Sequence, residues 1–233
     1  MCSNYTPARR DVLPVHFGVE APSSGWKDEA FPGYLAPIIR LADDGSGELD
    51  SLAACFGMVP HWADLKLSRH TYNARSETAA SKPSFRHAVA KRQRCIVPAE
   101  SIFEPCYESG RAVRWRIASD DGKPLAIAGL WEWRPNGGPD DQPLFSFTML
   151  TMNADAHPLM RRFHRPEDEK RMVVLLDEAQ YRPWLEAGAA DMAAFLQAWP
   201  AERMTAEPAP RATAARAAPS KAPKAMPKSL WDD

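Results

Sequence analysis

Short apolar runs separated by turn residues dominate the first 200 residues of the chain. The runs are rich in β-branched and aromatic residues, and turn pairs such as Asp121-Gly122 lie between several of them. Runs of this length and composition are typical of β-strands. We therefore predict strands at residues 54–59, 93–98, 114–118, 125–133, 145–152 and 172–176.

Helical periodicity is restricted to a few segments. We predict helices at residues 84–91, where Phe85 and Val89 stand four apart, and at 178–186 and 190–199. Because so few helices interrupt the strands, the pattern favours an α+β domain built on a mainly antiparallel, barrel-like sheet.

The alternating pattern ends near residue 200. From Ala201 onward the chain is rich in Ala and Pro, and basic residues outnumber acidic ones. Such a stretch buries too little apolar surface to offset the entropy lost on ordering it. We predict one domain over residues 2–200 and a disordered, mildly basic tail over residues 201–233. The favoured interpretation of the tail is a solvated appendage, and the alternative is a weak tether to DNA or a protein, anchored by Leu230 and Trp231.

Composition narrows the class of protein. With 233 residues, 45% of them hydrophobic, the chain can bury one sizeable core. Its formal net charge is −1, so any affinity for nucleic acid requires a local basic patch. No segment resembles a secretory signal or reaches the ~20 apolar residues that span a bilayer. We expect a cytoplasmic protein without a membrane partner.

The cysteines and histidines do not indicate a metal. The four cysteines form no C-x-x-C pair, and in a reducing compartment they are expected to be thiols. Cys55 and Cys95 lie in apolar runs, which favours burial as small hydrophobic residues. The six histidines show neither i, i+4 spacing nor pairing with cysteine, so we predict no metal and no cofactor.

Cys2 directly follows Met1, which is expected to be removed before so small a residue. Removal would leave a 1,2-aminothiol, with ordinary pKa values of ~8 for the amine and ~8.5 for the thiol. Such a group can condense with an aldehyde to an imine and close to a thiazolidine, or its thiol can attack a carbonyl. Taken alone, a cysteine at position 2 is more simply explained by chance.

Residues 56–105 combine basic side chains with an aromatic, Trp62, on either side of the predicted helix at 84–91. Cations that hold phosphates and a ring that stacks on a base are what a groove for single-stranded nucleic acid requires. An ordinary charged face explains the spacing equally well.

Two further side chains could move protons. Glu104 follows an apolar run, where partial desolvation would make it a usable acid or base near neutrality. Most glutamates at strand ends are simply solvated. His164 precedes an apolar run and could exchange a hydrogen bond with a sugar oxygen. His157 competes with it, and the pattern does not choose between them.

The order of these residues and of the motifs around them resembles the SOS response-associated peptidase (SRAP) family, the abasic-site sensors that crosslink themselves to DNA. The resemblance covers roughly residues 2–190. It rests on Met1-Cys2, Gly57-Met58-Val59-Pro60 with Trp62, Asn73-Ala74-Arg75, Phe85-Arg86, Arg94-Cys95-Ile96-Val97-Pro98-Ala99, Phe103-Glu104, Ala128-Gly129-Leu130-Trp131, Asn153-Ala154, and His164 before Arg171-Met172-Val173.

The resemblance implies a role for each catalytic residue. Cys2 would form a thiazolidine with the ring-opened aldehyde of an abasic deoxyribose. Asn73 would hydrogen-bond the adduct or the cysteine backbone. Glu104 would manage protons at the α-amine, and His164 would contact the opened sugar and assist ring opening.

The resemblance also implies a DNA surface. Arg75 and Arg86 would hold phosphates beside the lesion, Trp62 would stack near the gap left by the missing base, and we add Asn4 and Arg94 to these DNA contacts. The chain departs from the family in having Cys2-Ser3-Asn4 where Cys-Gly-Arg is usual, Pro105 after the glutamate, and an insertion between His164 and Arg171. A divergent subfamily is indicated.

The leading hypothesis is a monomeric, nucleoid-associated protein that senses abasic sites in single-stranded DNA. It would form a reversible covalent crosslink that protects the lesion during the SOS response, with possible lyase activity through the same imine. The family's peptidase name reflects processing of its own N-terminus, where only Met1 precedes the cysteine. Two alternatives are a peptidase that acts on other proteins and a non-covalent module that binds single-stranded DNA.

Overall fold

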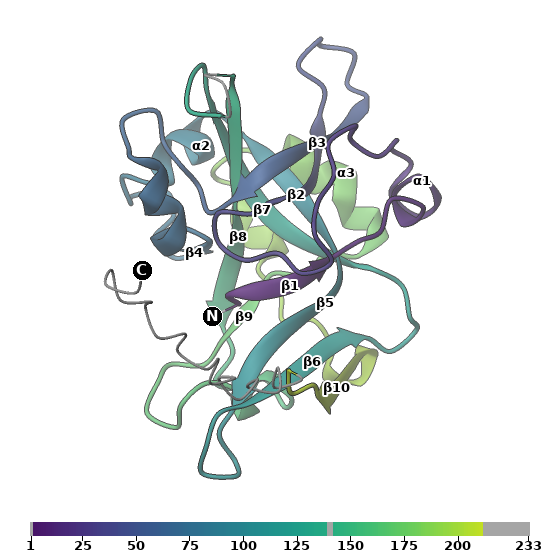
Figure 1. Cartoon of the computed structure of the whole chain (residues 1–233), viewed down its shortest axis with the longest axis vertical. Helices are drawn as coiled ribbons and strands as arrows, with labels where there is room; N and C mark the ends of the chain where they lie inside the picture. The colour runs from purple at the N-terminus through teal and green to yellow at the C-terminus, as the bar shows by residue number, and fades with distance from the viewer. Residues whose placement is uncertain (1, 139–141, 212–233) are drawn as a thin grey trace, which may run out of the picture.

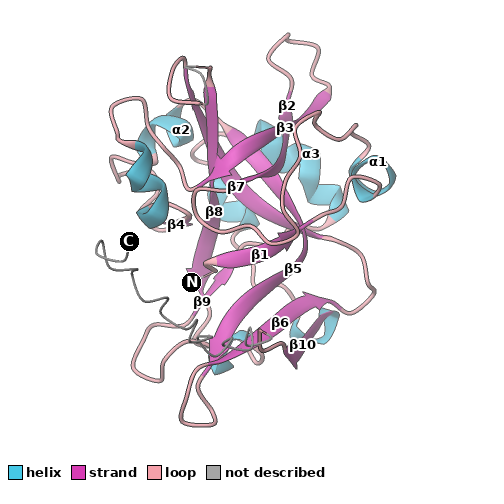
Figure 2. Ribbon diagram, viewed as in Figure 1, coloured by secondary structure: helices cyan, strands magenta, loops and turns pink. Residues whose placement is uncertain are grey.

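Strands fill the middle of the molecule and short helices lie around them (Figure 1, Figure 2). The protein is described from a computed structural model that covers residues 2–138 and 142–211. The fold is a mixed α+β one dominated by a single 10-stranded sheet, which confirms the predicted fold class. The strands are β1 (Asn4–Pro7), β2 (Leu35–Leu41), β3 (Leu49–Phe56), β4 (Asn73–Arg75), β5 (Arg94–Cys106), β6 (Val113–Ser119), β7 (Leu125–Arg134), β8 (Leu144–Asn153), β9 (Arg171–Val173) and β10 (Met204–Pro208).

The helices are all short. The α-helices are α1 (Val12–Phe17), α2 (Arg86–Ala90) and α3 (Tyr181–Glu186). The described chain also has short 3₁₀ helices: η1 (Leu65–His70), η3 (Met160–Arg162), η4 (Glu178–Gln180), η5 (Met192–Phe195) and η6 (Ala201–Arg203).

The sheet is organised around β5, which has 13 residues and pairs antiparallel with β1, β2, β6 and β7. Because β2 pairs with β3, β3 with β8 and β8 with β7, the hydrogen bonding returns to β5 and makes a ring. Most pairs are antiparallel as predicted, while β8 runs parallel to β3 and β4.

Two glycines from the sequence motifs permit close approaches that any side chain would block. A Cβ on Gly129 would lie 2.8 Å from both Cys95 Sγ and Thr148 O, so its absence lets β5, β7 and β8 pack together. Gly57 has a φ of +107°, and a Cβ there would lie 2.0 Å from the carbonyl oxygen of Ser68. Both glycines are therefore required by the fold.

The predicted strands are present, with shifts at their ends. The segment 54–59 overlaps only the end of β3, and 172–176 overlaps β9 by two residues. β5 extends well beyond 93–98, through Pro98 and Pro105 to Cys106, because its second half pairs with β1 and β6. The predicted helix at 190–199 is wrong: only the 3₁₀ turn η5 forms there.

The predicted tail does not begin at residue 201. Residues 204–208 form β10, which pairs antiparallel with β6 from Met204↔Ser119 to Pro208↔Trp115. The Ala/Pro-rich composition predicted disorder, but the edge of β6 has unpaired backbone groups, and pairing with them orders this segment as a strand. Residues 212–233, which include Leu230 and Trp231, lie outside the described residues. Within the described part, no helix is long and apolar enough to cross a membrane.

Candidate active site

β1 carries the N-terminal segment into the core. Asn4 pairs with Phe103 and Tyr5 with Ile102, so the residues just before Asn4 run alongside Glu104 at the far end of β5. Cys2 is 1% exposed and belongs to the main hydrophobic cluster, and its thiol donates a hydrogen bond to Asn4 O at 3.4 Å. Strand pairing thus fixes where the cysteine lies.

Asn73 holds the backbone of Cys2. Its Nδ2 donates to the carbonyl oxygen of Cys2 at 2.8 Å. Asn73 is itself fixed, because it opens β4 and pairs with Met149 of β8. The contact joins two segments that are distant in sequence, and it matches the role that the family resemblance implied for this side chain.

Glu104 and His164 form a buried pair. Glu104 is 2% and His164 7% exposed, and His164 Nε2 lies 2.8 Å from Glu104 Oε2. The backbone of His164 is left-handed, with a φ of 64°, and its N–H donates to Pro105 O at 2.8 Å. This turn directs the imidazole back toward the strand residue that precedes Pro105. The two candidate proton carriers are therefore one unit.

The thiol of Cys2 is held in its neutral form. Burial raises its pKa, and the neighbouring charge of Glu104 raises the pKa further. Burial also raises the pKa of Tyr72, and the charges of Cys2 and Glu104 raise that pKa further. Tyr72 therefore belongs to the same cluster. Sequence reasoning missed this residue although it directly precedes Asn73.

His157 has a structural role. Its Nδ1 accepts hydrogen bonds from the backbone N–H groups of Leu159 and Met160, at 3.2 and 3.0 Å. Its Nε2 consequently carries the proton and donates to Trp199 O at 2.7 Å. Both ring nitrogens are occupied in holding the loop before η3. Between the two histidines that the sequence left open, His164 is the one that contacts Glu104.

Three of the predicted DNA contacts are accessible. Trp62 is 58% exposed, and Arg86 is exposed at the start of α2. Arg75 is also exposed and forms an ion pair with Glu169 at 2.7 Å. A phosphate would have to compete with that carboxylate for Arg75.

Arg94 and Asn4 do not fit the predicted role in DNA binding. Arg94 is 1% exposed, its guanidinium donates to Ala88 O and Val89 O, and it lies 5.5 Å from the ring centre of Trp184. Asn4 is 6% exposed and donates to Glu29 Oε2 at 3.1 Å. Both side chains point into the protein, where they hold neighbouring segments and cannot reach a phosphate.

A cavity of about 330 Å³ opens beside His164. Its other lining residues include Tyr107, Arg161 and Lys170, so the opening next to the buried pair is basic. Sequence reasoning missed these cations because both lie outside the matched motifs, Arg161 in η3 and Lys170 in the insertion between His164 and Arg171. Among the described residues no group of three or more His, Cys, Asp or Glu is arranged to hold a metal ion.

Comparison with known proteins identifies similar chains. The family model described as SOS response associated peptidase (SRAP) matches residues 1–214. The abasic site processing protein YoqW of Bacillus subtilis is 33% identical over 189 residues, which cover 76% of this chain and 79% of that protein. The abasic site processing protein HMCES of Xenopus tropicalis is 28% identical over 63% of this chain and 48% of its own length.

Solved structures share the fold. A crystal structure of a protein from Bordetella bronchiseptica superposes with a TM-score of 0.80 and 38% identity, covering 89% of this chain and 99% of that one. A crystal structure from Bacteroides thetaiotaomicron has a TM-score of 0.73 at 21% identity, covering 88% of this chain and 90% of that one. The second shows a common fold alone.

Proposed function

Since the chain belongs to the SOS response associated peptidase (SRAP) family, we propose that it recognises abasic sites in DNA and processes them through Cys2. The observation that carries the proposal is the cluster of Cys2, Asn73, Glu104 and His164. An N-terminal aminothiol beside a buried carboxylate–imidazole pair has the groups that condensation with an aldehyde needs.

The chemistry proceeds in two steps once Met1 has been removed. The α-amine of Cys2 attacks the aldehyde carbon of the ring-opened deoxyribose, and water leaves to give an imine. The thiol sulfur then adds to the imine carbon while its proton is transferred to the imine nitrogen, which closes a thiazolidine. One molecule of water is released, no oxidant is needed, and each step can reverse.

The state of the thiol supports this order of steps. Because burial and Glu104 raise the pKa of the Cys2 thiol, the sulfur is protonated at neutral pH and is a weak first nucleophile. The amine, with an ordinary pKa of ~8, reacts first. Transfer of the thiol proton to the imine nitrogen then gives an iminium and a thiolate, and the thiolate closes the ring.

Glu104 and His164 exchange the protons that these steps require. The amine must lose a proton before it attacks, and the departing hydroxyl must gain one. A carboxylate and an imidazole 2.8 Å apart can supply both transfers without bulk water. Asn73 fixes the carbonyl of Cys2, and thereby the Cα from which both the amine and the thiol project.

The exposed aromatic and basic groups favour single-stranded DNA. Trp62 offers a stacking surface and Arg86 a cation, while Arg161 and Lys170 line the opening beside His164. We propose that the crosslink shields the lesion during the SOS response, and that the imine also permits strand cleavage as a lyase.

One gel experiment tests the proposal. The purified protein is incubated with a single-stranded oligonucleotide that carries one abasic site, then denatured without borohydride. We expect a slowly migrating adduct that is absent for Cys2→Ala and for DNA with an intact base. Cys2→Ser keeps the amine but lacks the sulfur, so its product should survive denaturation only after borohydride reduction.

Other outcomes have definite meanings. Retention on a native gel with no adduct after denaturation would contradict the covalent proposal and favour a non-covalent binding module. Cleavage of protein substrates that depends on Cys2, without an adduct, would favour the peptidase. An intact mass that retains Met1 in an active preparation would exclude the amine as the nucleophile.

A further inference from the structure

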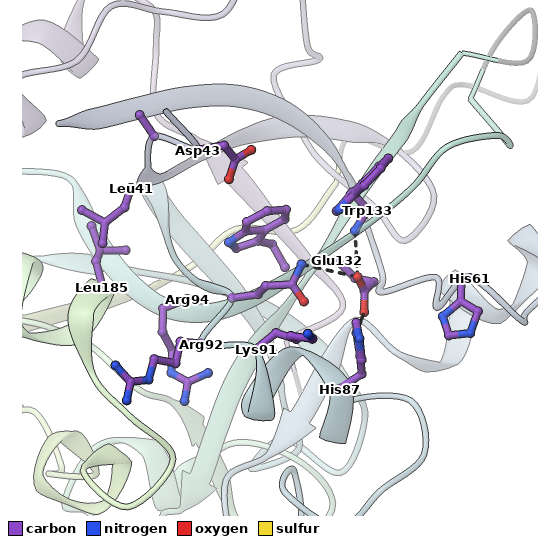
Figure 3. A pocket seen from close by; sticks show the side chains of 13 residues that line it. Leu41, Asp43, His61, His87, Lys91, Arg92, Arg94, Glu132, Trp133 and Leu185 are labelled. Atoms are coloured by element: carbon purple, nitrogen blue, oxygen red, sulfur yellow. Dashed lines mark hydrogen bonds and ion pairs between the residues drawn. The ribbon is translucent and has the colours of Figure 1, made fainter. Parts of the chain in front are cut away.

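A second pocket lies away from the candidate active site, between α2 and the end of β7 (Figure 3). Its volume is about 570 Å³, and none of Cys2, Asn73, Glu104 and His164 lines it. We call it the α2–β7 pocket. It is lined by Leu41, Ala42, Asp43, His61, His87, Lys91, Arg92, Gln93, Arg94, Trp131, Glu132, Trp133 and Leu185.

The pocket presents unpaired cations. Lys91 and Arg92 follow α2, are exposed, and form no ion pair with any described residue. The two carboxylates of the pocket are already engaged, Asp43 with Arg40 at 2.5 Å and Glu132 with His87 at 2.6 Å. The charge left over for a ligand is therefore positive, which suits a phosphate.

The backbone of Arg92 is an independent sign of function. Its φ is 55°, and His164 is the only other residue besides glycines with a positive φ in the described chain. After a helix end this left-handed position usually holds Gly or Asn, and a larger side chain costs roughly 1 kcal/mol or more. The strained backbone at this arginine therefore supports a role for its guanidinium.

Trp133 supplies an aromatic surface beside these cations. It is 47% exposed, whereas its neighbour Trp131 is 7% exposed and is covered by Arg40, 4.5 Å from the ring centre. In Figure 3, Trp133 lies above Glu132, whereas Lys91 and Arg92 lie below Glu132 and to its left. An exposed ring with cations across a pocket is the arrangement that binds a base and its phosphate.

The floor between them is polar and rigid. Glu132 is 3% exposed, and its carboxylate accepts from the backbone N–H of Trp133 at 3.1 Å and from Gln93 Nε2 at 3.4 Å. The dashed contacts of Figure 3 show this carboxylate between His87 and Trp133. Fixed acceptors and donors at the base of the pocket can meet the polar edge of a nucleobase.

The pocket adjoins the surface that is proposed to hold DNA. His61 and His87 both line it, and their rings contact edge-on at 6.1 Å between centres. Trp62 directly follows His61 in the chain, and Arg86 directly precedes His87. Both Trp62 and Arg86 are exposed groups of the proposed DNA surface. A strand lying across Trp62 and Arg86 would reach the pocket without a break.

We propose that the α2–β7 pocket binds a nucleotide of the DNA strand that flanks the abasic site, with its base stacked on Trp133 and its phosphate between Lys91 and Arg92. The identity of the ligand as DNA rests on the proposed function. A free nucleotide has the same chemistry, and the test separates the two sources.

Fluorescence anisotropy with intact single-stranded oligonucleotides of increasing length tests the pocket without any crosslink. We expect Trp133→Ala and Arg92→Gly each to raise the Kd for long oligonucleotides about tenfold. Arg92→Gly should also reduce the slope of log Kd against log salt concentration by about 0.7. Lys123→Ala, which removes an exposed cation of another pocket, is the matched control and should change neither.

Arg92→Gly separates binding from folding, because glycine adopts a φ of 55° without strain. Its melting temperature should equal or exceed that of the wild type while its affinity falls.

Two results would overturn the proposal. One is that Trp133→Ala and Arg92→Gly bind oligonucleotides of every length as tightly as Lys123→Ala does. The other is that a labelled mononucleotide binds the wild type as tightly as a long strand does and binds Arg92→Gly more weakly. The pocket would then serve free nucleotides. Failure of the abasic crosslink in the wild type would contradict the proposed function and leave this measurement intact.

Discussion

At the scale of single residues, the buried pair of Glu104 and His164 is the most demanding feature of the site. A charged carboxylate with 2% exposure is costly unless a partner and hydrogen bonds compensate it. His164 supplies that partner at 2.8 Å, at the expense of a left-handed backbone. The fold therefore bears a cost to keep a carboxylate and an imidazole in contact beside Cys2.

Replacement of Glu104 tests whether that pair moves protons. Glu104→Gln keeps the shape of the side chain and removes its basicity, so adduct formation should slow by about 100-fold or more. The adduct should still accumulate with time, because Cys2 remains. The measurement is a time course on denaturing gels, with Glu100→Gln on the same strand as control. Equal rates for the two variants would exclude proton transfer by Glu104.

At the scale of secondary-structure elements, the site depends on strands at both ends of the described chain. β1 inserts beside β5 and delivers Cys2, while β10 covers the outer edge of β6. β6 in turn pairs with β5 through Glu104↔Trp115. The strand that holds the glutamate is thus supported from both sides.

Removal of β10 tests this support. A chain that ends at Arg203 loses five strand residues and the packing of Met204, which is 8% exposed. It should melt roughly 5 °C below a chain that ends at Arg211. Thermal unfolding followed by circular dichroism makes the comparison. If the two chains melted together, β10 would contribute nothing to the stability of the domain.

At the scale of the whole molecule, the core contains thiols that stay protonated. All four cysteines are buried and free. Burial raises the pKa of Cys2 and of Cys95, and it raises that of Cys55 to about 11. Unfolding returns the thiols of Cys2, Cys55 and Cys95 to an ordinary pKa of ~8.5. The folded state therefore binds more protons than the unfolded state once the pH exceeds that value.

The sign of the effect on stability follows. Below pH ~8.5 both states are protonated and the contribution of these thiols is fully present. Above it the unfolded state loses protons first, so the free energy of unfolding falls by about 1.4 kcal/mol per pH unit for each fully buried thiol. Urea denaturation between pH 7 and 10 measures this slope. Cys95→Ala should reduce the slope of the unfolding free energy against pH by the contribution of one thiol. An unchanged slope would contradict the explanation.

The sequence by itself determined the class of fold and the positions of the central strands, and it predicted which residues make up the candidate site. Apolar runs and turn pairs are short-range signals, so residues 93–98 and 125–133 were recognisable as strands. The predicted set of Cys2, Asn73, Glu104 and His164 came from ordered motifs, and the first two are joined by one hydrogen bond and the last two by another.

Only the tertiary structure decided which polar groups face solvent. Arg94 and Arg86 look alike in sequence, yet Trp184 of α3 covers the first, whereas the second is exposed. His157 and His164 were separated by the groups that each ring contacts, backbone groups at His157 and the Glu104 carboxylate at His164. β10 formed because β6 offered it an edge. Burial and pairing depend on residues far along the chain, and a local pattern does not contain that information.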